Sequence, residues 1–370
     1  MKPPMGNKGL YRVALFCVIA WSAVSRLMAQ TSGLQLPPAP ALVAQPLVTA
    51  PAPSAPPIPR EDWSVLRVDS ASLQPVSVAL IGYVEHPEYT MELLRVEWRH
   101  SDPIDLYVVT PHGVKNPPVV LYLYGYPADS DLFRGEGWCK RVTQDGFAAV
   151  GFASALTGQR YANRPMKEWF VSELQESLGS TVHDVQMILN YLASRGDLDV
   201  SHVGMFGQGS GGAIAVLAAQ ADPRISALDL LNPWGDWSDW LKSSPQVPEA
   251  ERARYLTPEF LKRVENLDPI LYLPKLNLKD LRIQQVMDDP VTPAIAKQKI
   301  AASVRYPEQL VQYNDTSAYR DAWRVSGLPE WIHKQLRPSQ PSESSRGIQP
   351  VAPVIAGQNT LPTPKLQAVQ

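Results

Sequence analysis

Residues 184–212 read DVQMILNYLASRGDLDVSHVGMFGQGSGG, and the order of elements within this stretch decides the fold. It begins inside residues 173–194, where apolar side chains recur at the spacing of one helix face. Residues 203–206 then form a short apolar run, typical of a strand that is buried on both faces. A glycine-rich turn leads directly into residues 211–219, which are small and helix-compatible. This order predicts an α/β domain with a mostly parallel, doubly wound sheet.

The same alternation of strand and helix continues on both sides of this stretch. Two β-rich runs flank Ser101-Asp102-Pro103, a turn signal, so the sheet is expected to begin with an antiparallel hairpin. The expected strands are residues 94–100, 105–111, 119–124, 147–152, 227–231, 281–287 and 309–313, and a further helix is expected at residues 293–303.

Residues 234–274 interrupt this alternation and are expected to form a small cap insertion over the carboxyl edge of the sheet. The segment carries Trp234, Trp237 and Trp240, followed by charged helical pieces. The alternative is that the three tryptophans only fill a small core of the insertion itself.

Proline marks where the folded part of the chain begins and ends. Of the 36 prolines in 370 residues, nine fall in residues 37–59 and six more between Pro338 and Pro364. Such segments bury too little apolar surface to fold. We therefore expect one α/β domain at residues 60–336, between a Pro/Ala-rich linker (30–59) and a disordered Pro/Ser-rich tail (337–370).

Residues 1–29 have the features of a secretory signal peptide. Lys2, Lys8 and Arg12 precede an apolar run, residues 13–24. Twelve helical residues span about 18 Å, too short for a hydrocarbon core of about 30 Å. We expect an exported protein, periplasmic or extracellular, with no stable membrane span after cleavage. An uncleaved anchor remains the alternative.

Charge and cysteine content narrow the possible partners. Removing the signal peptide removes four basic residues and leaves 30 basic against 36 acidic ones, which argues against a nucleic-acid partner. Cys17 leaves with the signal peptide, so Cys139 has no cysteine with which to form an internal disulfide. The sequence has no zinc-type Cys/His cluster and no phosphate-binding loop, so neither a metal nor a cofactor is expected.

Three motifs carry a resemblance to a known family. Residues 184–212 resemble the helix, strand and nucleophile elbow of α/β-hydrolases, particularly the catalytic domains of prolyl-oligopeptidase and acyl-aminoacyl-peptidase enzymes. Tyr124-Gly125-Tyr126-Pro127 is similar to their YGGP stretch, and Asp289-Pro290-Val291-Thr292-Pro293 to their D-x-V-x-P segment. The motifs occur in the family's order within residues 90–335. The resemblance implies an α/β-hydrolase fold and a serine hydrolase acting on esters or short peptides.

The nucleophile position is the main departure from that pattern. Aligning the glycines places Gly209 where the family has its serine, and Ser210 one residue later, where its backbone N–H would belong to the oxyanion hole. A shifted elbow with Ser210 as the nucleophile is one interpretation. A degenerate elbow, packed tightly by its glycines, is the other.

The remaining catalytic positions are only partly filled. Asp289 matches the triad acid, although the adjacent Asp288 is a second candidate. His333 is the only histidine beyond Asp289, and it falls in an expected terminal helix rather than after the last strand. The hydroxyl of Tyr124 is a candidate oxyanion donor, as the resemblance implies.

Two functional hypotheses follow from these residues. The first is an exported serine hydrolase that uses Ser210, Asp289 and His333. The second is a catalytically inactive homologue that binds a ligand or a protein in the cell envelope.

Overall fold

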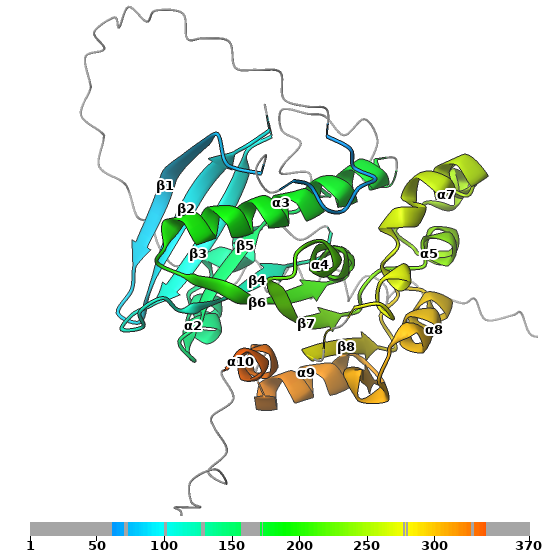
Figure 1. The fold of residues 1–370 in the computed structure, drawn as a ribbon. Helices are drawn as coiled ribbons and strands as arrows, with labels where there is room; N and C mark the ends of the chain where they lie inside the picture. The colour runs from blue at the N-terminus through cyan, green and yellow to red at the C-terminus, as the bar shows by residue number, and fades with distance from the viewer. Residues whose placement is uncertain are drawn as a thin grey trace, which may run out of the picture. The chain divides into compact units, whose positions relative to one another are not determined.

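The computed structural model describes residues 61–69, 73–99, 102–126, 130–156, 171, 173–276, 278, 280–326 and 329–337. The expected signal peptide (1–29), the linker (30–59) and all of the expected tail (337–370) except Arg337 lie outside these residues. The described part contains a nine-stranded sheet, shown in Figure 1, with the order β1-β2-β3-β5-β4-β6-β7-β8-β9. Its strands are β1 (Ser77–Glu85), β2 (Tyr89–Glu97), β3 (Ile104–Pro111), β4 (Pro118–Leu123), β5 (Ala148–Phe152), β6 (Asp199–Gln208), β7 (Ile225–Leu231), β8 (Asp280–Val286) and β9 (Leu310–Tyr313).

The sheet confirms the expected fold class. Strands β5, β4, β6, β7, β8 and β9 run parallel to one another. Strands β1, β2 and β3 form an antiparallel meander that joins β5 through β3. The expected hairpin corresponds to β2 and β3, whereas β1 was not expected. Eight of the nine residues of β1 are exposed, so it lacks the in–out alternation by which a strand is found in a sequence.

Helices cover both faces of the sheet. The helices are α2 (Glu136–Thr143), α3 (Leu174–Arg195), α4 (Ser210–Ala221), α5 (Trp237–Ser243), α6 (Arg252–Tyr255), α7 (Pro258–Val264), α8 (Ala294–Ser303), α9 (Thr316–Ser326) and α10 (Glu330–Leu336). Helices α3 and α4 pack on one face, with the larger apolar core beneath them. Helices α2 and α10 pack on the other face over a smaller core rich in aromatic residues. Strands β4, β5 and β7 are therefore buried almost completely from both sides, whereas the edge strand β9 is only partly buried.

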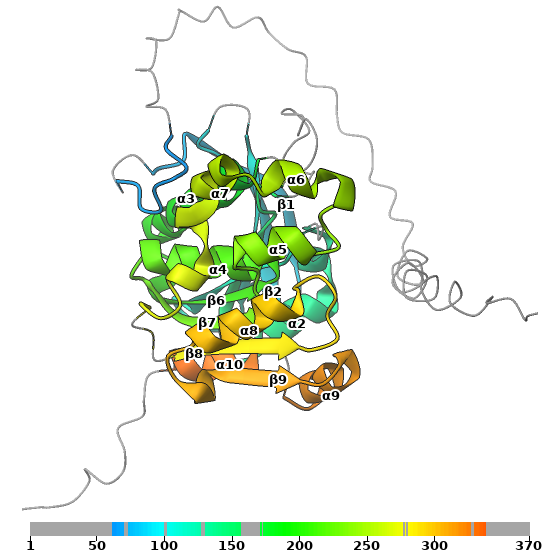
Figure 2. The ribbon, with the colours of Figure 1, turned by 90° about the vertical axis from the view of Figure 1, so that its right-hand side faces the viewer.

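The segment expected as a cap insertion contains α5, α6 and α7, which pack with α8 and α3 on the side of α4 (Figure 2). The carboxylate of Asp268 fixes its start by accepting hydrogen bonds from the backbone N–H groups of Asp236 (2.8 Å) and Trp237 (2.9 Å). Trp234, Trp237 and Trp240 are buried in the main core rather than in a separate core of the insertion.

Candidate active site

The turn between β6 and α4 has the backbone geometry of a nucleophile elbow. Gly209 occupies it with φ 55° and ψ −117°, a combination that is sterically costly for a residue with a side chain. Its N–H donates to the carbonyl of Leu231 (2.9 Å), and its carbonyl accepts from the N–H groups of Gly212 (3.1 Å) and Ala213 (3.2 Å). In the structure, therefore, Gly209 and not Ser210 occupies the position of the nucleophile in the elbow.

The space beside Gly209 is occupied by a tryptophan that the sequence analysis did not assign to the site. A Cβ at Gly209 would lie 3.2 Å from Nε1 of Trp234 and 3.7 Å from Cα of Gly125. The backbone N–H of Trp234 donates to the carbonyl of Gly209 (3.0 Å), which fixes the ring beside the turn. The first atom of a nucleophilic side chain would thus be in close contact with the indole.

Ser210 is turned away from the position of a nucleophile. It is the first residue of α4, its side chain is fully buried, and its Oγ accepts a hydrogen bond from the N–H of Tyr126 (2.9 Å). In α/β-hydrolases, an N–H from the loop at this place completes the oxyanion hole. Here the corresponding N–H, that of Tyr126, is already hydrogen-bonded to the hydroxyl oxygen of Ser210.

Asp289, the candidate triad acid, accepts hydrogen bonds from backbone N–H groups of the turn that follows it. Oδ2 of Asp289, after β8, accepts from the N–H of Thr292 (3.1 Å), and Lys297 Nζ donates to the Asp289 carbonyl (2.7 Å). Burial lowers the pKa of Lys297. The neighbouring Asp288 accepts from Thr316 Oγ1 (2.9 Å). The loops after β8 and β9 thus meet through Asp288 and Thr316, and the sequence has no histidine between residues 287 and 326.

His333 lies at the other end of the sheet. It is buried in α10, its Nδ1 is 3.0 Å from Oδ2 of Asp145, and its ring stacks on Phe147 at 4.1 Å. Asp145 and Phe147 precede β5, whereas Gly209 follows β6, and the two strands run in the same direction. Burial lowers the pKa of His333. The structure therefore does not bring His333 to Ser210 and Asp289.

Tyr124 directly precedes the glycine that packs against the elbow. Its hydroxyl accepts from Nε1 of Trp138 (2.7 Å), and its ring lies against Phe133 and Phe206. Burial raises the pKa of Tyr124 above its ordinary value, so the hydroxyl stays protonated. This contact leaves the hydroxyl's own proton available for donation, since the indole N–H is the donor.

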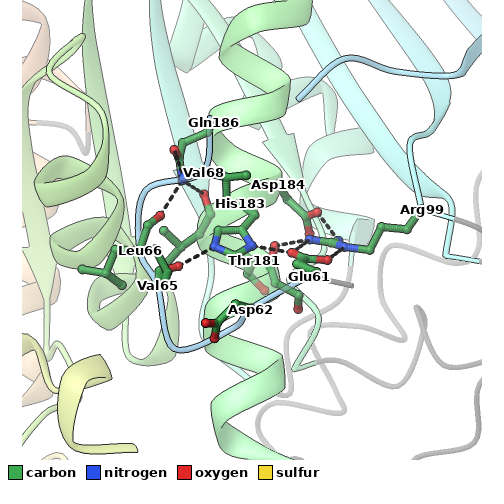
Figure 3. Close-up of polar contacts among 12 residues, drawn as sticks. Glu61, Asp62, Val65, Leu66, Val68, Arg99, Thr181, His183, Asp184 and Gln186 are labelled. Atoms are coloured by element: carbon green, nitrogen blue, oxygen red, sulfur yellow. Dashed lines mark hydrogen bonds and ion pairs between the residues drawn. The ribbon is translucent and has the colours of Figure 1, made fainter. Parts of the chain in front are cut away.

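A dense polar cluster lies elsewhere, between residues 61–68 and α3 (Figure 3). Arg99 Nη2 donates to Glu61 Oε1 (2.7 Å), while the ring of His183 is bonded to Glu61 through Nδ1 and to the Val65 carbonyl through Nε2 (2.6 Å). Burial raises the pKa of Glu61, but hydrogen bonds from His183 and Arg99 outweigh it and lower the pKa to about 2. Nothing in this cluster belongs to the elbow.

The described residues contain no group of three or more His, Cys, Asp or Glu side chains that could hold a metal ion. Within the same residues, no helix is long and apolar enough to cross a membrane. Cys139 is a buried free thiol.

Comparisons with known proteins agree with this architecture. Residues 104–253 match the Dienelactone hydrolase family. Acetyl xylan esterase from Paenibacillus sp. R4 is similar over 69% of this chain and 90% of its own, at 17% identity and a TM-score of 0.54. Acetyl xylan esterase 1 from Thermoanaerobacterium sp. JW/SL YS485 is similar over 72% of this chain and 92% of its own, at 13% identity and a TM-score of 0.56.

The acylaminoacyl peptidase of Pyrococcus horikoshii is similar over 69% of this chain and 47% of its own, at 11% identity and a TM-score of 0.45. No curated protein matches the chain. The resemblance expected from the three sequence motifs is confirmed: the chain has the α/β-hydrolase fold, and its residues 104–253 resemble the Dienelactone hydrolase family.

Proposed function

We propose that this protein is a catalytically inactive α/β-hydrolase homologue that acts as a binding module. The observation that carries the proposal is the contact of Trp234 with Gly209, 3.2 Å from the indole nitrogen to the position of a Cβ. Acyl transfer in this fold requires a nucleophilic oxygen at the elbow and an imidazole within hydrogen-bond reach of it. Neither group is found there among the described residues.

Hydrolysis through Ser210 is the second candidate, because the chain resembles a hydrolase family over residues 104–253. For that reaction, Oγ would have to leave its bond with the Tyr126 N–H and emerge from a fully buried position. It would also need a base, and His333 is bonded to Asp145 at the opposite end of the sheet. These requirements favour the inactive homologue.

The ligand is proposed to be a small ester or peptide, or a protein, held near the loops that follow β4, β6 and β8. Export to the periplasm or the medium remains part of the proposal and rests on residues 1–29. N-terminal sequencing of the secreted protein tests it, with Gln30 as the expected first residue.

Activity-based labelling separates the two candidates. The full chain, Ser210→Ala and Gly209→Ser are each treated with a fluorophosphonate probe and with p-nitrophenyl acetate. We expect no labelling and no turnover above buffer for the first two proteins. Gly209→Ser should also be inactive, because it supplies an oxygen without a base. Labelling of the unmodified chain that disappears in Ser210→Ala would establish a serine hydrolase with a shifted elbow instead.

A further inference from the structure

Strand β1 forms one edge of the sheet and is exposed along almost its whole length (Figure 1). The side chains of Leu80, Ile81 and Tyr83 are 57%, 45% and 55% exposed, and Val78 and Val84 are exposed as well. The strand pairs with β2 along one side only. It therefore presents a row of apolar side chains next to backbone N–H and C=O groups that no other strand of the sheet pairs.

Such an edge is unusual in a protein that remains monomeric. Natural sheets protect their edges with charged residues, proline, short strands or bulges. In β1 the only charged residue is Glu85, at the end, and the only irregularity is a bulge at Ile81. The opposite edge strand, β9, is short, with only four residues, and is followed by α9. Apart from this bulge and Glu85, β1 therefore carries none of these protective features along its nine residues.

We propose that β1 pairs antiparallel with β1 of a second copy of this chain, so that two sheets join into one across a two-fold axis. The inference is independent of whether the elbow is catalytic. Residues 37–59 of the chain's own arm are poorly suited to this edge, because nine prolines there lack the N–H that a ladder requires. A second β1 supplies a strand that is uncharged from Ser77 to Val84, so no like charges meet along it.

The bulge determines which residues face each other. Before it, Val78 lies opposite Val96, whose side chain belongs to the core under α3. After it, Tyr83 lies opposite Glu92, whose carboxylate is 2.7 Å from Arg195 of α3, so Tyr83 is on that same face. A perpendicular two-fold axis keeps faces matched. Among the registers that match faces, the one that pairs the two strands over most of their length, with their uncharged parts fully paired, places Val78 opposite Tyr83 of the second copy.

A charge swap on this pair tests the proposal in the full chain. Val78→Lys/Tyr83→Lys places like charges opposite each other twice per dimer, whereas Val78→Glu/Tyr83→Lys places opposite charges there. Both variants carry two charges at the same exposed positions. By sedimentation velocity over a concentration series, we expect a dimer for the unmodified chain and for the Glu/Lys variant. The Lys/Lys variant should dissociate with a Kd raised about tenfold or more.

Disulfide trapping provides a second test, which detects the dimer directly and does not depend on weakening it. In a Cys17→Ser background, Ile81→Cys lies near its own copy across the axis, within the reach of a disulfide. Ile295→Cys is the matched control, because Ile295 is 46% exposed and lies in α8, away from the edge. Mild oxidation should give a covalent dimer for Ile81→Cys only. A monomeric chain at all concentrations, a dimer equally stable in the Lys/Lys variant, or equal trapping of both cysteines would overturn the proposal.

Discussion

The Nε1 atom of Trp234 lies 3.2 Å from the position that a Cβ on Gly209 would take, although the two residues are 25 positions apart in the sequence. The contact joins the end of β6 to the start of the segment after β7. Two separate features therefore favour glycine at residue 209: its backbone angles, and the indole beside the position of a Cβ. Both requirements can be measured.

Gly209→Ala is expected to destabilise the protein by about 2 kcal/mol, because the backbone angles of Gly209 are strained for an L-residue and the new Cβ meets the indole. Gly137→Ala is the matched control, since a Cβ there meets nothing within 4 Å and Gly137 is in α2. Alanine should stabilise that helix by several tenths of a kcal/mol. Urea unfolding measures both changes, and equal effects at the two glycines would contradict the interpretation of the elbow.

A double-mutant cycle separates the strain from the contact. Gly209→Ser and Trp234→Ala are each expected to destabilise the protein, the second by about 3 kcal/mol through loss of a buried ring. The combined variant should lose less than the sum of the two, because removal of the indole makes room for the serine. A coupling free energy of about 1 kcal/mol or more is expected from urea unfolding. Strict additivity would show that the contact contributes nothing.

The cluster around Glu61 should make stability sensitive to acid. The pKa of Glu61 is about 2 in the folded protein, below its ordinary value of 4.5. Its carboxylate therefore stabilises the fold above pH 4.5, and this contribution is lost as the pH falls towards 2. At neutral pH, Glu61→Gln should lower the free energy of unfolding by about 2 kcal/mol, after allowance for solvent screening.

The difference between Glu61→Gln and the unmodified chain should shrink below pH 4.5, as followed by urea unfolding at several pH values. Glu136→Gln serves as the control, because Glu136 is exposed and its contacts with Lys140 and His86 both lie at the surface. It should have little effect at any pH. A pH-independent loss in Glu61→Gln would mean that packing, and not charge, holds residues 61–68 on α3.

His333 is expected to act on stability and not on catalysis. Burial holds its pKa below 6.5 in the folded protein, so the unfolded chain binds the proton more readily. Above pH 6.5 His333 is neutral in both the folded and the unfolded chain, and its titration does not affect stability. As the pH falls from 6.5 towards the lowered pKa, the unfolded chain takes up the proton first, so the free energy of unfolding decreases. His333→Gln should flatten this slope, whereas exposed His202→Gln should leave it unchanged. Thermal unfolding between pH 5 and 8 distinguishes the two.

Much of the fold could be predicted because its signals are local. The run of strand, glycine turn and small-residue helix at β6 and α4 needs no distant residue to be recognised, and the predicted elements fall within a few residues of the observed ones. Strand β1 could not be found in this way, because its apolar side chains face solvent on both sides and follow no burial pattern. Its pairing with β2 is what makes it a strand.

The candidate site was harder to predict because its decisive contacts are not local. The glycine spacing placed Gly209 at the elbow, and the backbone angles agree with that placement. The contact with Trp234 and the bond from the Tyr126 N–H to Ser210 depend on how two loops meet, which spacing does not encode. His333 is the only histidine after Asp289 in chain order, but its position in space is set by the packing of α10 near the start of β5.

The contact between Thr316 and Asp288 bears on how this site could change in evolution. An acyl-transfer site at this elbow would need a serine at residue 209, room beside it and a histidine in the loop after β9. The structure has Gly209, the indole of Trp234, and Thr316 bonded to Asp288 at these places. The first substitution alone would cost stability and return no activity. Residues 209, 234 and 316 would therefore have to change together before an acyl-transfer site could form at this elbow.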